Sequence, residues 1–394
     1  MSLSLWLDPL PSPRAPLEGD LQVDVVIIGG GLCGCSAAWH LASAGISVAL
    51  LESRQIAMSA SGRNAGFILQ GTAERYDRAI AVMGAEKARA VHAWSLENHR
   101  LMAELIEQER LDCGYMRRGS LQLADSVEEE ESLVASSELL QRDGFEVRLL
   151  KADQLPPVFA GAGYRLGVHL PADGELDPAR FVRGLADRAE QKGAKIYEQC
   201  PVIELDAASP GEVRLRTAHG TVHAAIALVC TNARAGELLP SLATIVDPVR
   251  GQMIGTAPLP PLFPMPVYAN HGYDYWRQDE KGRIALGGWR NLDPGTEVGH
   301  DEILHGDIQE RMEKFLRRFA PDLQITHRWS GIMGFSRDSL PVVGPARGAP
   351  GALVAAGFTG HGFGFAFLAG KALADIVSEG RHPFADQMDP RRFS

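Results

Sequence analysis

Three glycines near the start of the chain have the spacing of a loop that binds a dinucleotide. Gly29, Gly31 and Gly34 follow the mostly β-branched run 24–28 and open a mostly small and apolar stretch at 35–42 that is typical of a helix. In such a loop the first glycine permits a tight turn and the second lets the backbone approach a pyrophosphate. The third lets the helix pack closely on the strand. The spacing therefore predicts that this turn binds the phosphates of a dinucleotide.

An acid follows at the distance that this chemistry requires. The run 46–51 predicts a second buried strand, and Glu52 stands at its carboxyl end, 52 − 34 = 18 residues after Gly34. A carboxylate about 20 residues beyond the glycines accepts hydrogen bonds from the ribose hydroxyls. Strand, helix, second strand and acid together favour a dinucleotide site over a plain βαβ unit. The fingerprint by itself also fits an NAD-dependent dehydrogenase, which is an alternative at this point.

The composition is typical of an α/β enzyme large enough for two domains. The chain has 394 residues, 45% of them apolar, and 42 glycines. Its net charge of −10 disfavours nucleic acid and anionic membranes as partners and suits a cationic small substrate. Five scattered cysteines predict neither a metal site nor a disulfide framework, so we expect a cytoplasmic protein. No run reaches the ~20 apolar residues of a membrane span.

The order of the patterns predicts an α/β fold with a discontinuous, Rossmann-like nucleotide-binding domain. Apolar strands at 225–230 and 351–356 return to the character of the first strand, whereas 248–289 is β-rich and studded with prolines. We expect a second domain that binds substrate, made of an antiparallel β-sheet plus helices. The predicted division is an extended surface arm at 1–19, a nucleotide-binding domain at 20–80, 160–245 and 325–394, and a substrate domain at 81–159 and 246–324.

Two further glycine-containing segments are candidates for contact with a cofactor. The segment 59–67 is small and polar and comes just after the second strand, a position that favours cofactor contact over a plain surface loop. The segment 357–362 follows a buried strand and leads into an apolar helix at about 363–378. A helix that begins in this way presents free N–H groups and the positive end of its dipole to an anion.

The chain resembles the FAD-dependent D-amino-acid oxidase family, which includes glycine oxidase, sarcosine oxidase and D-amino-acid dehydrogenase. The resemblance runs from Val23 to about Ser378. The Ser-Gly-Arg-Asn sequence at 61–64 looks most like the branch of the family that acts on gamma-glutamylputrescine. The most specific motifs are 29–34, 61–66, 248–252, 329–331 with 340–344, and 358–363.

The resemblance implies FAD as a non-covalent cofactor and gives roles to the motifs. The glycine turn and Glu52 would hold the ADP half, and Val202 would meet the adenine through its backbone. The segment 61–66 would run along the isoalloxazine, and the last helix would point its N-terminus at the flavin N1–C2=O locus. The implied cofactor-binding residues are Gly29, Gly31, Leu32, Gly34, Glu52, Ser53, Ser61, Gly62, Arg63, Asn64, Ala65, Gly66, Val202, Thr231, Asn232, Ala233, Gly331, Gly360, His361, Gly362, Phe363 and Gly364.

The resemblance also implies that a hydride leaves the carbon next to the substrate nitrogen for flavin N5. The amine must be uncharged at that moment, so a dry aromatic pocket that disfavours the ammonium assists the reaction. A turn histidine without a catalytic part is an equal alternative for His361. The candidate catalytic residues are His361, Tyr275 and Arg63, and the candidate pocket residues are Phe67, Tyr273, Tyr275, Trp276 and Met333.

Two departures from the family pattern bear on the substrate and the acceptor. In glycine oxidase and the D-amino-acid dehydrogenases the position of Met333 carries an arginine that binds the substrate carboxylate, which a thioether cannot do. An α-amino acid is thereby disfavoured unless Arg63 or Arg290 binds its carboxylate. In sarcosine oxidase a lysine used in oxygen activation stands at the position of Ala285, and no cysteine beyond Cys230 could link the flavin.

We therefore expect an FAD-dependent oxidoreductase acting on the CH–NH or CH–NH2 group of a small amine, with oxygen or another electron acceptor. The preferred substrate is a secondary amine or a polyamine derivative such as gamma-glutamylputrescine. The alternatives are a D-amino-acid or glycine-type oxidase or dehydrogenase, and a flavin-binding protein without turnover. The absence of a cation at Ala285 favours slow reoxidation by oxygen.

Overall fold

The glycine turn lies at the carboxyl end of a strand in the centre of a six-stranded sheet. The computed structural model describes residues 3–393. All neighbours in this sheet are parallel except the edge strand β19, which runs antiparallel to β20. The strand order is β19 (Val342–Pro345), β20 (Ala352–Ala356), β13 (Ile226–Val229), β2 (Val25–Ile28), β3 (Val48–Leu51) and β9 (Lys195–Tyr197).

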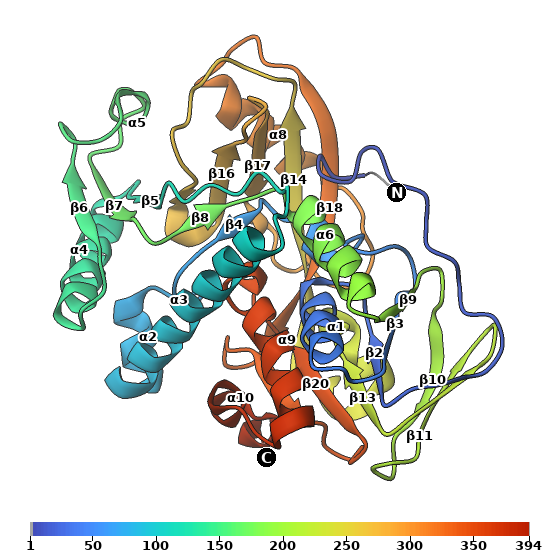
Figure 1. Cartoon of the computed structure of the whole chain (residues 1–394). Helices are drawn as coiled ribbons and strands as arrows, with labels where there is room; N and C mark the ends of the chain where they lie inside the picture. The colour runs from blue at the N-terminus through green and yellow to red at the C-terminus, as the bar shows by residue number, and fades with distance from the viewer. Residues whose placement is uncertain (1–2, 394) are drawn as a thin grey trace.

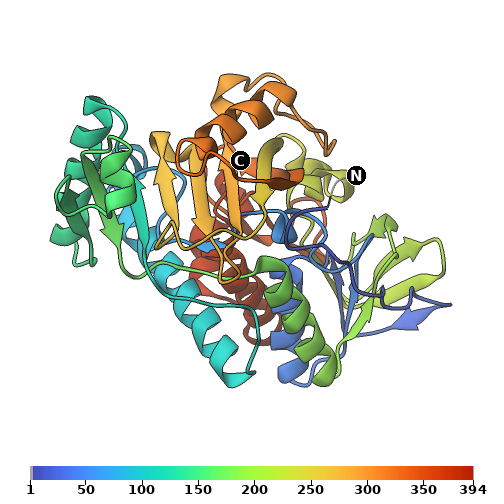
Figure 2. The ribbon, with the colours of Figure 1, turned by 90° about the horizontal axis from the view of Figure 1, so that it is seen from above.

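Both faces of this sheet are buried, one of them under helices, and this is why its central strands are apolar throughout. Every residue of β2, β3 and β20 is buried. A Cβ at Gly370 would lie 2.4 Å from the carbonyl oxygen of Cys33, so this glycine lets α9 approach α1 closely. Figure 1 shows the helices side by side, and Figure 2 shows α9 at the centre of the molecule. The helices are α1 (Leu32–Ser43), α6 (Pro178–Gln191) and α9 (Gly362–Glu379), with α3 (Ala85–Gln108) packed against α9.

An eight-stranded sheet forms the second large layer. Its neighbours are antiparallel except β15 and β5, which are parallel. Helix α8 (Gly306–Arg317) contacts its strands β14 and β17. The strand order is β18 (Ile325–Ser336), β14 (Val246–Thr256), β17 (Ile284–Gly288), β16 (Asp274–Gln278), β15 (Val267–Ala269), β5 (Ser120–Leu123), β7 (Leu166–Leu170) and β6 (Arg148–Lys151).

The described residues also form two small sheets and five further α-helices. The four-stranded sheet consists of β1 (Leu21–Gln22), β12 (Thr221–Ala224), β11 (Val213–Thr217) and β10 (Val202–Asp206), and the two-stranded sheet of β4 (Phe67–Ile68) and β8 (Gly174–Glu175). The remaining helices are α2 (Tyr76–Met83), α4 (Val127–Arg142), α5 (Pro157–Gly161), α7 (Ala235–Leu238) and α10 (Pro383–Met388).

The boundary between the two large sheets differs from the predicted domain boundaries at 160 and 325. Strands β7 and β18, on the nucleotide-binding side of those boundaries, pair within the eight-stranded sheet. The reason is that β18 pairs with β14 over almost its whole length, a long-range contact that no local pattern reveals. A division into a cofactor and a substrate domain stays a proposal.

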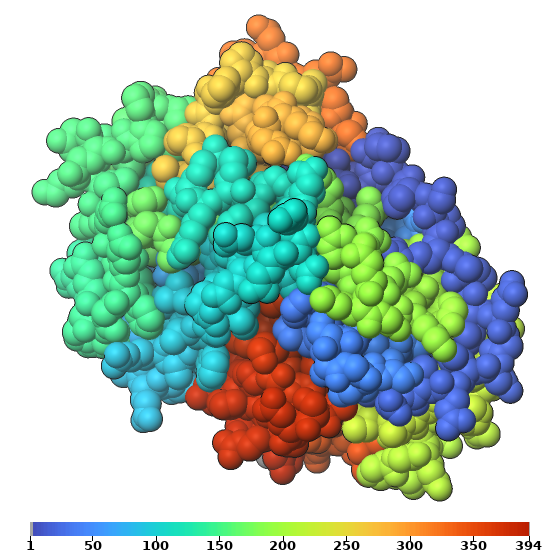
Figure 3. All heavy atoms as spheres, in the orientation of Figure 1, coloured from blue at the N-terminus to red at the C-terminus, as the bar shows by residue number. Residues whose placement is uncertain are grey.

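The N-terminal segment is a surface arm over only part of its length. Residues 8–16 are exposed or half-buried, and Figure 3 shows the segment along one side of the molecule. Leu5, Trp6 and Leu7, however, are buried in the core. The indole Nε1 of Trp6 donates a hydrogen bond to the carbonyl oxygen of Asn64 at 2.7 Å. The prediction of a purely superficial arm is wrong for these residues, because their apolar side chains leave water and support the 61–66 loop.

No helix within residues 3–393 combines the length and the apolar character that crossing a membrane requires.

Candidate active site

A cavity of about 830 Å³ extends from the glycine turn to the aromatic strands of the eight-stranded sheet. Its walls come from the carboxyl ends of β2, β3 and β13 and from strands β14, β15, β16 and β18. Binding sites in open parallel sheets lie at these carboxyl ends. The volume is within the range of cofactor sites, about 300–1,000 Å³.

The glycine turn has the close packing that its spacing predicts. Gly29 has φ +108°, and a Cβ there would lie 2.7 Å from the carbonyl oxygen of Cys230. A Cβ at Gly34 would lie only 2.0 Å from the carbonyl oxygen of Gly29. Gly29, Gly31 and Leu32 line the cavity, whereas Gly34 faces the strand. The first two glycines therefore shape the wall, and the third lets α1 pack against β2.

Glu52 is buried at the end of β3 and lines the cavity beside the turn. Its Oε2 accepts a hydrogen bond from the backbone N–H of Gly30 at 2.7 Å. Its Oε1 accepts from the N–H of Arg54 at 2.8 Å and from the hydroxyl of Ser53 at 3.2 Å. These donors fix the carboxylate at the cavity wall. Val202 lines the wall just beyond it.

The opposite wall of this end is formed by the turn after β13. Thr231, Asn232 and Ala233 line the cavity, and Asn232 accepts a hydrogen bond from the N–H of Gly357 at 2.9 Å. The hydroxyl oxygen of Thr231 is buried and has no hydrogen-bond partner among the described residues. A buried hydroxyl without a partner is costly, and a polar ligand in the cavity would satisfy it.

Some residues of the loop 61–66 line the cavity, and others hold the loop against neighbouring elements. Ser61, Arg63, Asn64 and Ala65 line the cavity, whereas Gly62 and Gly66 do not. A Cβ at Gly66, which has φ +75°, would lie 2.2 Å from the carbonyl oxygen of Leu176, so this glycine brings the loop against β8. The hydroxyl of Ser61 accepts a hydrogen bond from the N–H of Leu32 at 2.9 Å and ties the loop to α1.

Arg63 is almost completely buried, and its guanidinium is engaged on three sides. Nε and Nη1 donate to the carbonyl oxygens of Met58 at 3.0 Å and Ser330 at 2.8 Å. Nη2 pairs with Glu302 at 3.2 Å, an acid that Arg54 also contacts. These contacts hold the loop to β18. They leave the guanidinium poorly placed to bind a substrate carboxylate, the alternative that the sequence left open.

The N-terminus of α9 reaches the cavity at its middle. Gly360, His361, Gly362, Phe363 and Gly364 all line it, and His361 is the N-cap residue. Burial lowers the pKa of His361 to about 4, so its imidazole is neutral at pH 7. Its Nδ1 has no hydrogen-bond partner among the described residues. The N–H of Gly364 donates to the carbonyl oxygen of His361 at 3.0 Å, which leaves the N–H groups of Gly362 and Phe363 without a partner among the described residues, beside the uncharged ring.

Aromatic side chains enclose the end of the cavity away from the glycine turn. Tyr268 of β15 and Tyr275 of β16 are paired in register, and their rings are 5.6 Å apart. Phe67 makes edge contacts with both, at 5.4 Å and 6.3 Å. Burial raises the pKa of Tyr275 to about 12, so its hydroxyl stays protonated. Tyr273 also lines this end.

Met333 lies between this aromatic end and the start of α9. A Cβ at Gly251 would lie 3.1 Å from the Met333 Cε and 3.7 Å from the Tyr275 hydroxyl. A Cβ at Gly360 would lie 3.7 Å from the Met333 Sδ. Gly331, two residues earlier on β18, lines the cavity next to Arg63. The thioether therefore lines the predicted substrate pocket between Tyr275 and the start of α9.

The prediction of Trp276 as a pocket residue is wrong. Successive side chains of a strand point to opposite faces, so Trp276 lies on the face of β16 away from Tyr275. It is fully buried and packs against Phe263 at 6.0 Å and Phe315 at 4.9 Å. Ala285 does not line the cavity either: it lies directly across from Arg277 in the sheet and is fully buried.

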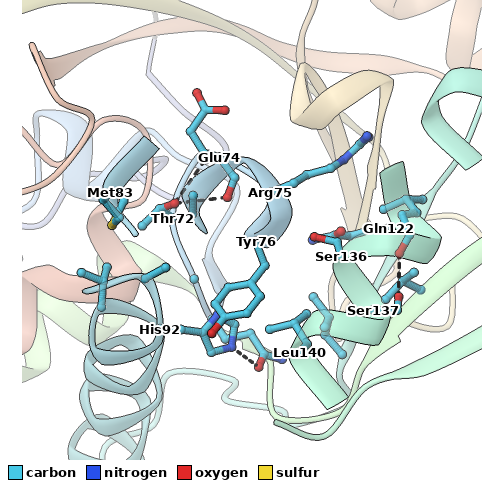
Figure 4. A pocket seen from close by; sticks show the side chains of 18 residues that line it. Thr72, Glu74, Arg75, Tyr76, Met83, His92, Gln122, Ser136, Ser137 and Leu140 are labelled. Carbon is cyan, nitrogen blue, oxygen red and sulfur yellow. Dashed lines mark hydrogen bonds between the residues drawn. The ribbon is translucent and has the colours of Figure 1, made fainter. Parts of the chain in front are cut away.

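A much smaller cavity, of about 40 Å³, adjoins the large one between α2, α3 and α4 (Figure 4). The ring of Tyr76 and the imidazole of His92 lie in it, and His92 Nε2 is 3.0 Å from Gln70 Oε1. This volume holds only a few water molecules. The larger cavity is therefore the candidate for cofactor and substrate.

Comparison with known proteins agrees with this geometry. The family model described as FAD dependent oxidoreductase, DAO, matches residues 24–376. The chain belongs to the DAO family of FAD-dependent oxidoreductases. It is 28% identical over 379 residues to gamma-glutamylputrescine oxidoreductase of Escherichia coli, covering 93% of this chain and 86% of that protein. It is also 28% identical to glycine oxidase of Geobacillus kaustophilus, covering 90% and 93% of the two chains.

Solved structures with the same fold span nearly the whole chain. The glycine oxidase from Geobacillus kaustophilus has a TM-score of 0.81 at 24% identity and covers 95% of this chain and 98% of its own. L-proline dehydrogenase from P. horikoshii has a TM-score of 0.79 at 23% identity and covers 96% and 98%. As a DAO-family member the protein is an FAD-dependent oxidoreductase acting on CH–NH or CH–NH2 groups.

The cavity fits the cofactor of this DAO-family enzyme. FAD needs a wall that its pyrophosphate can approach, an acid for its ribose and donors near the flavin. The turn at Gly29 and Gly31, the carboxylate of Glu52 and the free first turn of α9 provide these groups. The unpartnered Thr231 hydroxyl adds a polar atom that a ligand would satisfy. When bound, FAD supplies the acceptor for the hydride.

Several residues of the cavity carry no signal in the sequence. Asp173 is completely buried at the aromatic end, and desolvation raises the pKa of its carboxyl to about 7. Phe335 and Glu302 also reach the cavity, from β18 and from the loop before α8. None of the three stands in a motif, and only the tertiary contacts bring them to the site. Tyr268 could have been inferred, because it pairs with Tyr275 across one hairpin.

Proposed function

We propose that the protein oxidises the C–N bond of a secondary amine or of a polyamine derivative such as gamma-glutamylputrescine. The observation that carries this proposal is the thioether of Met333 in the pocket, close to Tyr275 and to Gly360. In the amino-acid-oxidising members that the chain resembles, this position holds the arginine for the α-carboxylate. A thioether offers no hydrogen bond to a carboxylate, so the position selects for a substrate without a carboxylate on the carbon whose C–N bond is oxidised.

The residues around Met333 suit an uncharged amine. Phe67, Tyr268 and Tyr275 exclude water and make the ammonium form of the substrate costly. The neutral His361 adds no positive charge that would oppose binding and has a free Nδ1 to orient the amine. His361 and Tyr275 can both orient the amine through hydrogen bonds. Neither side chain has to gain or lose a proton at neutral pH to do so. The similarity to gamma-glutamylputrescine oxidoreductase supports the same substrate class.

The test is anaerobic reduction of the bound flavin, followed as bleaching of its visible absorption. We expect gamma-glutamylputrescine or an N-methylalkylamine to bleach the flavin faster than glycine, sarcosine or D-alanine. If one of these amino acids proves the best reductant, the substrate class is wrong. Full flavin occupancy without bleaching by any compound would instead support a flavin-binding protein without turnover.

A glycine-type or D-amino-acid oxidase or dehydrogenase is the second candidate. The observation in its favour is the 28% identity to glycine oxidases, equal to that of the polyamine relative. It requires another cation for the α-carboxylate, since Arg63 is engaged by Ser330 and Glu302. The same bleaching panel separates the two candidates.

Cofactor attachment and the acceptor complete the proposal. No cysteine of the sequence lies beyond Cys230, so we propose that FAD is released by acid precipitation. A yellow precipitate would contradict this. Ala285 lies outside the cavity, but of the two other candidate cations His361 is neutral at pH 7 and Arg63 is engaged by Glu302, so neither offers its charge for oxygen activation. We therefore propose faster reoxidation by an artificial quinone than by oxygen, to be measured by stopped-flow mixing of reduced enzyme with each acceptor.

A further inference from the structure

Arg290 reaches the aromatic end of the cavity from the turn after β17. The chain enters this turn through Trp289, which has a left-handed backbone with φ +58°. The Arg290 guanidinium then lies between two rings, 4.7 Å from the centre of Tyr273 and 4.8 Å from that of Phe335. All three residues line the cavity. The stacking fixes the plane of the guanidinium and leaves its N–H groups for another partner.

Among the described residues, Arg290 differs from the other arginines of the cavity because it has no acidic partner. Arg54 and Arg63 share Glu302, while Arg75 pairs with Glu129 and Arg234 with Glu237. For the Arg290 side chain the contacts within residues 3–393 comprise the two rings and neither an ion pair nor a hydrogen bond. A half-buried cation without a counter-ion is a position at which an anionic ligand gains the most.

The charge of Arg290 acts on the substrate pocket. It opposes the rise in pKa that burial causes at both Tyr268 and Tyr275, which places it within electrostatic reach of these hydroxyls. The Phe335 ring that carries Arg290 on its face has its edge 3.9 Å from the position of a Cβ at Gly360. Met333 borders Gly360 directly, whereas the Phe335 ring lies between Gly360 and Arg290. Arg290 is therefore further from the start of α9 than Met333 is.

We infer that Arg290 binds a carboxylate of the amine substrate, and that a spacer separates this carboxylate from the C–N bond that is oxidised. This inference rests on the proposed function and narrows its substrate class to amines with a remote acidic group. A guanidinium and a carboxylate form two parallel charge-assisted hydrogen bonds, which gives both affinity and orientation. The spacer follows from Phe335, because its ring lies between the Arg290 guanidinium and Gly360 at the start of α9.

The test measures binding to the oxidised holoenzyme, by calorimetry and by perturbation of the flavin spectrum. The probes are butanoate and its uncharged isostere butanamide. We expect Arg290→Met to raise the Kd of butanoate about 10–100-fold and to leave the Kd of butanamide unchanged. Arg290→Lys should recover part of the affinity, because it restores the charge without the two-pronged geometry.

The matched control is Arg318→Met, because Arg318 also stacks on two rings, Phe315 and Phe319, but outside the cavity. It should bind butanoate like the parent protein. An equal Kd for butanoate in the parent and in Arg290→Met overturns the inference. So does an equal loss of butanoate and butanamide binding, which would show that Arg290 only supports the pocket wall.

Substrate pairs separate this inference from the proposed function. N-methyl-4-aminobutanoate carries the remote carboxylate, and N-methylbutylamine lacks it. We expect Arg290→Met to raise the KM of the first with little change in kcat and to leave the second unaffected. Bleaching by neither compound, with butanoate binding lost in Arg290→Met, would refute the proposed function but retain the anion site. Flavin bleaching by both compounds, with the same KM values in Arg290→Met as in the parent protein, would support the proposed function and refute the anion site.

Discussion

The two ends of the cavity are built in different ways. At the end that we propose binds FAD, the cofactor end, the wall consists of backbone and of glycines, with Glu52 held by the N–H groups of Gly30 and Arg54. At the substrate end it consists of side chains from separate elements, such as Tyr268, Tyr275 and Met333. A side chain added at the glycines would displace the backbone, whereas side chains at the other end can be substituted without a change of the backbone. The cofactor end should therefore lose function abruptly on substitution, and the substrate end should change specificity.

The largest effect is expected for Gly34→Ala. The new Cβ would lie 2.0 Å from the carbonyl oxygen of Gly29, a backbone atom that cannot move aside cheaply, so α1 must leave its place on β2. Overpacking of this kind costs about 3 kcal/mol, which corresponds to a loss of FAD affinity of about 100-fold. Fluorescence titration of apoprotein with FAD measures it. Gly161→Ala, with open space around its Cβ, is the control and should bind FAD normally.

The second effect concerns Glu52. Its replacement by alanine removes a charged acceptor for the ribose hydroxyls, worth about 1.5–3 kcal/mol, so FAD affinity should fall at least about tenfold. Because Glu52 also accepts the N–H of Gly30, the thermal stability of the apoprotein must be measured alongside. A fall in stability with unchanged FAD affinity would mean that the acid only supports the glycine turn. Glu52→Gln keeps the shape of the side chain without its charge, so its FAD affinity should lie between those of the parent protein and Glu52→Ala.

The contrast between the two ends also explains what the sequence could predict. The glycine turn is a local motif, so its spacing with Glu52 was enough to place one half of the cavity. The substrate end depends on strand pairing and on which face each side chain takes. Because successive side chains of a strand point to opposite faces, Tyr275 and Trp276 cannot both face the pocket, but the sequence does not tell which of them does. The site of Arg290 depends on the left-handed turn at Trp289, for which the sequence carries no signal.

The buried start of the N-terminal segment shows the same limit. The prolines of this segment predicted an extended arm, and residues 8–16 do lie at the surface. Trp6 nevertheless bonds to Asn64, and the guanidinium of Arg277 lies 4.6 Å from the centre of its ring. Both contacts join residues far apart in the chain, so a local pattern could not reveal them.

A third prediction tests whether specificity can be changed at the substrate end without loss of FAD. Met333→Arg introduces the cation that the amino-acid-oxidising members carry at this position. A charge-assisted pair with an α-carboxylate contributes about 1.5–3 kcal/mol, so reduction of the flavin by glycine or D-alanine should become about tenfold more efficient. Met333→Leu keeps the volume without the charge and should leave the preference unchanged. Bound FAD per protein should stay constant in both, and its loss would contradict the independence of the two ends.

The smallest effect is expected for a buried acid in the wall of the substrate end. Asp173 Oδ1 accepts the N–H of Gln70 at 2.8 Å and Oδ2 accepts the hydroxyl of Ser120 at 2.6 Å, but desolvation dominates and raises the pKa to about 7. Because the pKa is raised above its unfolded value of about 3.9, the folded protein holds this proton more tightly. The stability that the proton contributes is therefore complete below pH 4 and is lost as the pH rises through 7.

Asp173→Asn should remove this dependence. An asparagine amide can accept from Gln70 and donate to Ser120, so it mimics the protonated acid. We expect the variant to melt only slightly higher than the parent holoenzyme at pH 5, where the unfolded carboxyl has begun to ionise, and a few degrees higher at pH 8, where the parent must bury a charge. The exposed Asp153→Asn should show no such difference between the two pH values. A variant that melts lower at pH 8 would mean that the carboxylate is stabilised in its charged form, and that this wall is more polar than its aromatic lining indicates.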